Sequence, residues 1–174
     1  MHAFRLAEPA DAAHLQDLVQ RAYRSSDEGW TTEKSMLAGE RINIATILKK
    51  LEDTNARVLV AVEDSGHIIG CCEIAHVQSQ NNTATFGLFA VEPRLQSAGL
   101  GRKMLAHAEA TANAEWGVTR VEMNVVAQRE ELIAWYLRRG YISTGEKRPF
   151  PFDKNINVEA LRDDLYFVVL VKTL

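Results

Sequence analysis

The sequence is poor in the features that mark disulfide-rich, membrane-spanning or metal-binding proteins. Its two cysteines, Cys71 and Cys72, are adjacent, and a disulfide between neighbours is strained and rare. We therefore expect two reduced thiols, as is usual in a cytoplasmic protein. No stretch reaches about 18 apolar residues without a charge, and the first residues lack a signal-peptide pattern, so we expect neither a membrane partner nor secretion. The five histidines show no H-x3-H spacing, so we expect no metal.

An excess of basic charge is also missing. The chain has 20 basic and 23 acidic side chains among 174 residues, a balance that gives no indication of nucleic-acid binding. Its length and its 47% apolar content predict one globular domain over residues 1–174. Residues 94–148 carry nine basic and six acidic residues, which suits an anionic ligand, although a difference of this size is often only a solvated surface.

Hydrophobic periodicity predicts alternating helices and strands. Helical spacing of apolar residues covers 9–22, 31–51, 99–115 and 130–139, and Gly39 is a point at which the second of these could divide. Strand patterns cover 4–6, 58–62, 68–77, 83–91, 119–125, 141–147 and 166–172. Hairpins mixed with crossover helices predict an α/β fold with a mixed sheet.

One segment combines a strand, a glycine-bearing loop and the start of a helix. The stretch 91–105 reads Val-Glu-Pro-Arg-Leu-Gln-Ser-Ala-Gly-Leu-Gly-Arg-Lys-Met-Leu. Unpaired amides and the dipole at a helix start attract anions, and Gly99 and Gly101 allow a phosphate to approach closely. Neither a Walker loop nor a dinucleotide fingerprint fits, because Arg102-Lys103-Met104 follows the second glycine. The alternative is a tight turn without a ligand.

The same segment resembles a known family. Gln96–Gly101 matches the Q/R-x-x-G-x-G/A motif of the GNAT (GCN5-related N-acetyltransferase) superfamily, and Phe89–Pro93 resembles the strand and proline before that motif. Residues 135–141 resemble the Y-x-x-x-G-[FY] end of the next helix in that family. The resemblance implies a mostly antiparallel mixed sheet with helices on both faces and one splayed parallel strand pair.

The resemblance also implies acetyl-CoA as the cosubstrate. Its pantetheine arm would pair with the strand backbone at Phe89 and Val91, and its pyrophosphate would lie on the amides of residues 96–101. The residues expected to bind the cofactor are Phe89, Ala90, Val91, Gln96, Ser97, Ala98, Gly99, Leu100, Gly101, Arg102, Asn124 and Arg129.

Two of these residues carry alternatives. Arg129 stands where relatives often have asparagine, and it either meets the phosphates or pantetheine of the cofactor or is an exposed residue at a helix start. Asn124 either takes part of the missing asparagine's role or is a satisfied residue at a strand end.

Two catalytic residues are expected. Tyr136, by its position in the family motif, would donate a proton to the departing thiolate. The unperturbed pKa of a phenol, about 10, is close to that of a thiol, about 8.5, so this transfer is feasible. The alternative is a core tyrosine. Glu73 would act as general base directly or through water, although a strand glutamate on a solvated face is an equal interpretation. Glu122 is a weaker candidate for the base.

Acceptor recognition is expected from the first loop and the last hairpin. Trp30 and Glu33, with Asp27 and Glu28, form an acidic patch with an aromatic ring that suits a cationic amine. The alternative is a solvated loop with one anchoring tryptophan. The aromatic loop 149–153 would wall the acceptor pocket, pack on the sheet edge or meet a second subunit in a homodimer.

The resemblance as a whole implies a cytoplasmic, acetyl-CoA-dependent N-acetyltransferase. We expect direct transfer of acetyl to the primary amine of a small molecule, such as an amino acid or a polyamine. A protein N-terminus or lysine is the alternative acceptor. A coenzyme A-binding sensor without turnover and a structural domain without a cofactor are the other interpretations.

Overall fold

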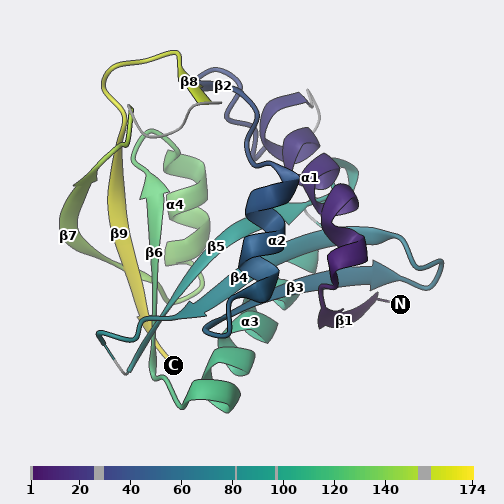
Figure 1. The fold of residues 1–174 in the computed structure, drawn as a ribbon. Coiled ribbons are helices and arrows are strands. Elements are labelled where there is room, and N and C mark those ends of the chain that lie inside the picture. The colour runs from purple at the N-terminus through teal and green to yellow at the C-terminus, as the bar shows by residue number, and fades with distance from the viewer. Residues whose placement is uncertain (1, 26–29, 81, 97, 153–157) are drawn as a thin grey trace.

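A seven-stranded sheet crosses the molecule in the computed structural model, which describes residues 2–25, 30–80, 82–96, 98–152 and 158–174 (Figure 1). In spatial order its strands are β1 (His2–Leu6), β3 (Ala56–Glu63), β4 (Ile68–His76), β5 (Thr83–Val91), β6 (Arg120–Val126), β9 (Tyr166–Thr173) and β7 (Ile142–Pro149). All neighbours are antiparallel except β5 and β6.

The parallel pair is joined at one end only. Residues 83–85 of β5 pair with residues 120–122 of β6, and the printed register ends there. Beyond Thr85 the two strands diverge, so the remainder of β5 faces a gap instead of a hydrogen-bonded neighbour. This is the splayed pair that the family resemblance predicts.

Helices cover both faces of the sheet. Helices α1 (Ala12–Gln20) and α2 (Ile44–Glu52) lie on one face, and α3 (Leu100–Trp116) and α4 (Glu130–Leu137) lie on the other (Figure 1). Alternation along β3 divides the core accordingly, because Val58 and Val60 pack with the first pair of helices while Leu59 packs with the second. The predicted mixed α/β fold with helices on both faces is confirmed.

The predicted helix over residues 31–51 is wrong in its first half. The chain there forms a short strand, β2 (Leu37–Gly39), which pairs with another short strand, β8 (Val158–Ala160). Gly39 has a φ of 85°, a conformation that ends a helical path, and α2 begins only after Asn43, whose Oδ1 accepts a hydrogen bond from the Thr46 amide. Pairing with β8, which sequence periodicity did not reveal, outweighs the helical spacing.

The helices of the described ranges are short. None of them is long and apolar enough to cross a membrane.

Candidate functional site

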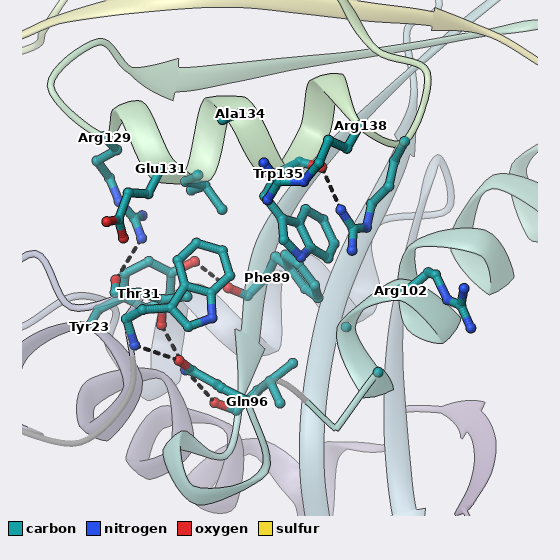
Figure 2. A pocket seen from close by; sticks show the side chains of 16 residues that line it. Tyr23, Thr31, Phe89, Gln96, Arg102, Arg129, Glu131, Ala134, Trp135 and Arg138 are labelled. Atoms are coloured by element: carbon teal, nitrogen blue, oxygen red, sulfur yellow. Dashed lines mark hydrogen bonds between the residues drawn. The ribbon is translucent and has the colours of Figure 1, made fainter.

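A cleft of about 460 Å³ opens between the end of β5, the start of α3 and the inner side of α4 (Figure 2). Its walls come from the glycine loop, from Trp30 and Thr31 of the first loop, and from one side of α4. The divergence of β6 from β5 creates the space for it. The cleft therefore lies where the sequence predicted an anion site.

The start of α3 presents backbone donors to this cleft. Gly99 has a φ of 82° and precedes the helix, whose first internal bond runs from the Lys103 amide to the Gly99 carbonyl at 3.2 Å. The amides of Leu100, Gly101 and Arg102 therefore have no acceptor within the helix. The amides of Gln96 and Ala98 instead close the preceding turn, at 3.3 and 3.2 Å. The donors available to an anion lie at residues 99–102, toward the end of the expected stretch.

Gly101 forms part of the cleft surface. A Cβ added there would lie 3.2 Å from Cζ of Phe89 and 3.6 Å from the Trp135 ring. The missing side chain therefore lets the start of α3 lie close to those two rings at the wall of the cleft. A ligand following the start of α3 can lie against the backbone only because this position is glycine.

The cleft is electropositive. Four arginines and one glutamate are among its described lining residues: Arg102, Arg129, Arg138, Arg139 and Glu131. The Arg139 guanidinium stacks 3.4 Å over the Trp135 ring, and burial, followed by repulsion from Arg138 and Arg102, lowers its pKa. Its Nε is buried without a partner among the described residues. An anionic ligand would reduce the repulsion among the arginines and give the Arg139 Nε a hydrogen-bond acceptor.

A second cavity, of about 220 Å³, continues from the cleft into the gap between β5 and β6. The two share Tyr23, Phe89, Arg129 and Leu132 as lining residues. Its described lining also includes Leu37 of β2, Val158 of β8, and Phe150 and Pro151 after β7. The two cavities form one path from the surface to the middle of the sheet.

The strand β5 is irregular where the cavities meet. The pairing of β4 with β5 shifts between Cys71 and Glu73, and Leu88 has a φ of 46°, which is rare for a side chain other than glycine. The Glu92 amide donates to Ile69 on β4, so the alternation of a strand turns the backbone groups of Phe89 and Val91 toward the gap. The bulge therefore directs backbone groups into the path.

A sequence model described as "Acetyltransferase (GNAT) family" matches residues 14–141. The chain belongs to the GNAT family. The expected family membership is thus confirmed. None of the curated protein sequences that were compared matches the chain.

Solved GNAT structures superpose on nearly the whole chain. The putative acetyltransferase yncA from Salmonella typhimurium, solved with acetyl-CoA, has a TM-score of 0.72 at 20% identity and covers 100% of this chain and 94% of its own. The ribosomal-protein-S18-alanine N-acetyltransferase of Escherichia coli has a TM-score of 0.71 at 18% identity and covers 99% of this chain and 94% of its own. A spermidine N-acetyltransferase chimera of Vibrio cholerae and hSSAT has a TM-score of 0.72 at 15% identity and covers 99% of this chain and 95% of its own. At these identities the likeness shows the fold.

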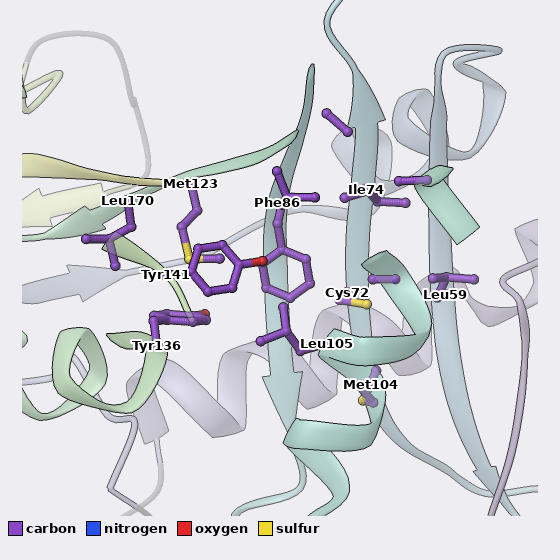
Figure 3. Packing of buried hydrophobic residues seen from close by; sticks show 14 of the residues in the cluster. Leu59, Cys72, Ile74, Phe86, Met104, Leu105, Met123, Tyr136, Tyr141 and Leu170 are labelled. Atoms are coloured by element: carbon purple, nitrogen blue, oxygen red, sulfur yellow. The ribbon is translucent and has the colours of Figure 1, made fainter. Parts of the chain in front are cut away.

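Tyr136 lines the second cavity. It lies on α4 and is 4% exposed, while its ring packs against Tyr141 at 5.7 Å (Figure 3). Burial raises the pKa of its phenol well above the ordinary value, so the group is protonated at neutral pH. The side chain is thus a core residue that also lines the second cavity, and its catalytic role stays a prediction.

Glu73 lies outside these two cavities. It lines a third cavity, of about 320 Å³, that shares Gly87 and Leu88 with the second, and its carboxylate is ion-paired with Lys50 at 2.6 Å. Glu122 lines the same third cavity and pairs with Arg148 at 2.7 Å. Both carboxylates are therefore held by cations beside the path.

The interpretation of Arg129 as an exposed helix-start residue is wrong. The side chain is buried directly before α4 and donates to Glu33 at 2.9 Å and to the Thr31 carbonyl at 2.6 Å. It lines both cavities, and it ties the first loop to α4 (Figure 2).

Glu33 does not form the expected acidic patch. Its carboxylate is 6% exposed and lies among Arg24, Arg129 and Arg41, at 2.7, 2.9 and 4.0 Å. These guanidiniums occupy it, so it offers no open carboxylate to a cationic amine. Asp27 and Glu28, the other predicted members, lie outside the described residues.

Trp30 lines the cleft at the start of α3 and not the second cavity. Its amide donates to Oε1 of Gln96 at 3.0 Å, while Nε2 of Gln96 donates to Thr31 and to the Val91 carbonyl. The motif glutamine therefore fastens the first loop over the cleft with its side chain (Figure 2).

The other predicted cofactor residues divide into three groups. Leu100 and Ala90 are buried in the core, so only their backbone can serve a ligand. Asn124 lines the second and third cavities and accepts from Arg148 at 3.0 Å, so it lies apart from the cleft. Ala98 is exposed, and Ser97 lies outside the described residues.

Sequence reasoning missed several residues of the path. Tyr23 lines both cavities, and its hydroxyl donates to the Phe89 carbonyl. Arg24 and Arg41 line the second cavity. No spacing pattern connects these residues with the glycine motif, because the fold brings them there from the far side of the sheet.

Proposed function

We propose that the chain transfers acetyl from acetyl-CoA to the primary amine of a small molecule, without a covalent enzyme intermediate. The observation that carries the proposal is the electropositive cleft at the start of α3, which leads into a cavity between diverging strands. Its donors at residues 99–102, its four arginines and the open face of Gly101 fit a diphosphate followed by a narrow arm.

The residues of the cleft would each hold a part of the cosubstrate. The amides at the start of α3 face the diphosphate, and Arg102, Arg138 and Arg139 supply the compensating charge. The backbone of Phe89 and Val91 pairs with the pantetheine amides along the unpaired side of β5. Both carbonyls already accept hydrogen bonds from Tyr23 and Gln96, so the N–H groups remain as the donors.

The size of the second cavity supports a small acceptor. Its volume is about 220 Å³, and Leu37, Phe150 and Pro151 are among its described lining residues. An extended peptide needs an open groove, while a small amine needs only a chamber next to the thioester.

In the proposed reaction a C–N bond forms and the C–S bond breaks. The proton lost by nitrogen balances the proton gained by sulfur. Backbone N–H groups at the β5 bulge, near Phe89, stabilise the developing oxyanion. Glu73, whose carboxylate pairs with Lys50 in the adjoining third cavity, takes the amine proton and returns it through water to the departing thiolate.

Tyr136 acts at the departing sulfur. Because burial keeps its phenol protonated, it serves as a hydrogen-bond donor to the thiolate, and the net proton comes from the attacking amine. The sequence alone suggested full proton transfer, because the unperturbed pKa values of a phenol and a thiol are close. The raised pKa of the buried Tyr136 phenol favours a hydrogen bond instead.

An assay of free thiol release with a panel of amines tests the proposal. The panel contains amino acids, polyamines and short peptides, and mass spectrometry identifies each acetylated product. Acetylation of a small amine is the expected result. Acetylation of peptides alone would favour a protein acceptor, and acetyl-CoA binding without release would favour a sensor.

A further inference from the structure

The charges around the second cavity are unbalanced. Four charged side chains are among its described lining residues: Arg24, Arg41, Arg129 and Glu33. Three are cations and one is an anion, which leaves a formal surplus of two positive charges. A chamber built for a cationic amine would have the opposite sign.

The single carboxylate is shared among the three guanidiniums. Arg129 donates to Oε1 of Glu33 at 2.9 Å, and Arg24 donates to Oε2 at 2.7 Å. Arg41 lies 4.0 Å from the same Oε2, beyond hydrogen-bond distance, and its guanidinium stands 5.1 Å over the Tyr23 ring. Glu33 therefore satisfies Arg129 and one end of Arg24, and it leaves Arg41 without a close acceptor on this carboxylate.

Arg24 carries a buried donor for which the described residues supply no acceptor. Its side chain is only 4% exposed, and its Nε finds no hydrogen-bond acceptor among the described residues. A buried, charged N–H without an acceptor is costly, and proteins rarely leave one in place without a role. Since Arg24 lines the cavity, an anionic group of a ligand can supply the missing acceptor.

The nearby acidic residues that the structure describes do not cancel the surplus. Glu73 and Glu122 line the adjoining third cavity, which also contains Arg41, and each has a cation of its own. Lys50 lies 2.6 Å from Glu73, and Arg148 lies 2.7 Å from Glu122. Among the residues that the structure describes, the arginines of the second cavity therefore keep a surplus of positive charge.

We propose that the acceptor is an amino acid, whose carboxylate binds Arg24 at Nε together with Arg41. This rests on the proposed acetyl transfer and names its substrate class. The carboxylate completes the hydrogen bonding of Arg24 and removes one of the two surplus charges. A polyamine adds positive charge to a positive chamber, so it is a poor acceptor.

The position of Arg24 suits a short distance between carboxylate and amine. It follows Tyr23, whose hydroxyl bonds to the Phe89 carbonyl at the junction of the two cavities. Arg24 lines the second cavity, so a carboxylate that it holds lies in the chamber that begins at this junction. An α-amino acid, with its two groups on one carbon, places its nitrogen at that junction.

Matched acceptors test the proposal with the purified protein and acetyl-CoA. Each amino acid is compared with its own carboxamide, which keeps the amine and side chain but lacks the anion, and with spermidine. We expect kcat/KM to be on the order of 10- to 100-fold higher for the acid than for the amide. Equal or better use of amides or spermidine overturns the inference and leaves acetyl transfer standing. No acetylation of any amine overturns the proposed function itself.

Two variants assign the effect to the arginines. Arg24→Lys keeps a cation for Glu33 but removes Nε, and Arg41→Gln removes the second cation. We expect each to raise KM for the amino acid roughly 10-fold or more while the KM of its amide and the affinity for acetyl-CoA stay unchanged. Arg162→Lys is the matched control, because Arg162 is exposed and paired with Asp164 at 2.6 Å. A preference for the acid that persists in both variants overturns the assignment.

Discussion

At the residue scale, the burial of Tyr136 determines what its phenol can contribute. The Tyr136→Phe variant keeps the ring that packs on Phe86 and Tyr141 and removes only the hydroxyl. We expect turnover to fall about 10²-fold, with little change in acetyl-CoA affinity. Because the raised pKa keeps the phenol protonated, the loss should be constant across roughly pH 6 to 9. Kinetics at saturating acetyl-CoA measure it, and unchanged turnover would remove Tyr136 from the mechanism.

The buried thiol of Cys71 predicts a loss of stability in alkali. Burial raises its pKa from the ordinary 9.0 to about 12, so the unfolded chain ionises first as the pH rises. The contribution of this neutral thiol to the free energy of unfolding is fully present below pH 9.0 and declines between pH 9.0 and about 12. At pH 10 one such thiol costs about 1.4 kcal/mol of unfolding free energy.

Urea unfolding at neutral and alkaline pH measures this effect. Cys71→Ala should lower stability at neutral pH, because it leaves a small cavity, yet show a shallower alkaline decline than the original chain. An identical decline in both proteins would contradict a thiol held neutral in the core.

At the scale of elements, the open face of α3 at Gly101 is expected to control cofactor affinity. Gly101→Val would place methyl groups against Phe89 and Trp135, in the space assigned to the cosubstrate. We expect the Kd for acetyl-CoA to rise at least about 10-fold, measured by calorimetry. Gly66→Val is the control, since its φ of 85° makes it strained but it lies in the turn between β3 and β4. Equal affinity in both variants would contradict the placement of the ligand.

The ion cluster around Glu33 joins the first loop to α4. Glu33→Gln leaves Arg24 and Arg129 buried without their counter-charge, and breaking a buried pair typically costs about 3–5 kcal/mol. We expect a loss of that order in urea unfolding. Adding Arg129→Met should recover part of it, because one uncompensated charge is removed. Additive losses in the double variant would show that the pair is not coupled.

These elements differ in how far the sequence predicted them. The strand, glycine loop and helix around 91–105 follow from local signals, namely turn chemistry and apolar spacing, and the structure has them there. The helix over 31–51 failed because β2 is stabilised by β8, a strand more than a hundred residues away. Local periodicity contains no information about such a partner.

The site follows the same division. Its cleft was predicted because its donors belong to one continuous segment. The acceptor side could not be predicted, because Glu33 is neutralised by three arginines that come from separate elements, Arg24, Arg41 and Arg129. The sequence shows an acidic residue beside Trp30, while the fold shows an arginine cluster.

At the scale of the whole molecule, acetyl-CoA should stabilise the fold by mass action. The cleft joins the first loop, β5, α3 and α4, so a ligand bound there links elements from most of the chain. At about 100 times its Kd, the free energy of unfolding should rise by about 2.7 kcal/mol. Thermal unfolding with and without acetyl-CoA measures this, and added salt should weaken the effect because the cleft is electropositive. Absence of any shift would favour a structural domain without a cofactor.

A crystal structure with acetyl-CoA tests the central claim most directly. The account predicts the diphosphate against the amides of residues 99–102, with Arg102, Arg138 and Arg139 around it, and the acetyl group between β5 and β6 near Tyr136. A ligand bound elsewhere, or strands β5 and β6 closed upon each other with the cleft filled by side chains, would contradict it.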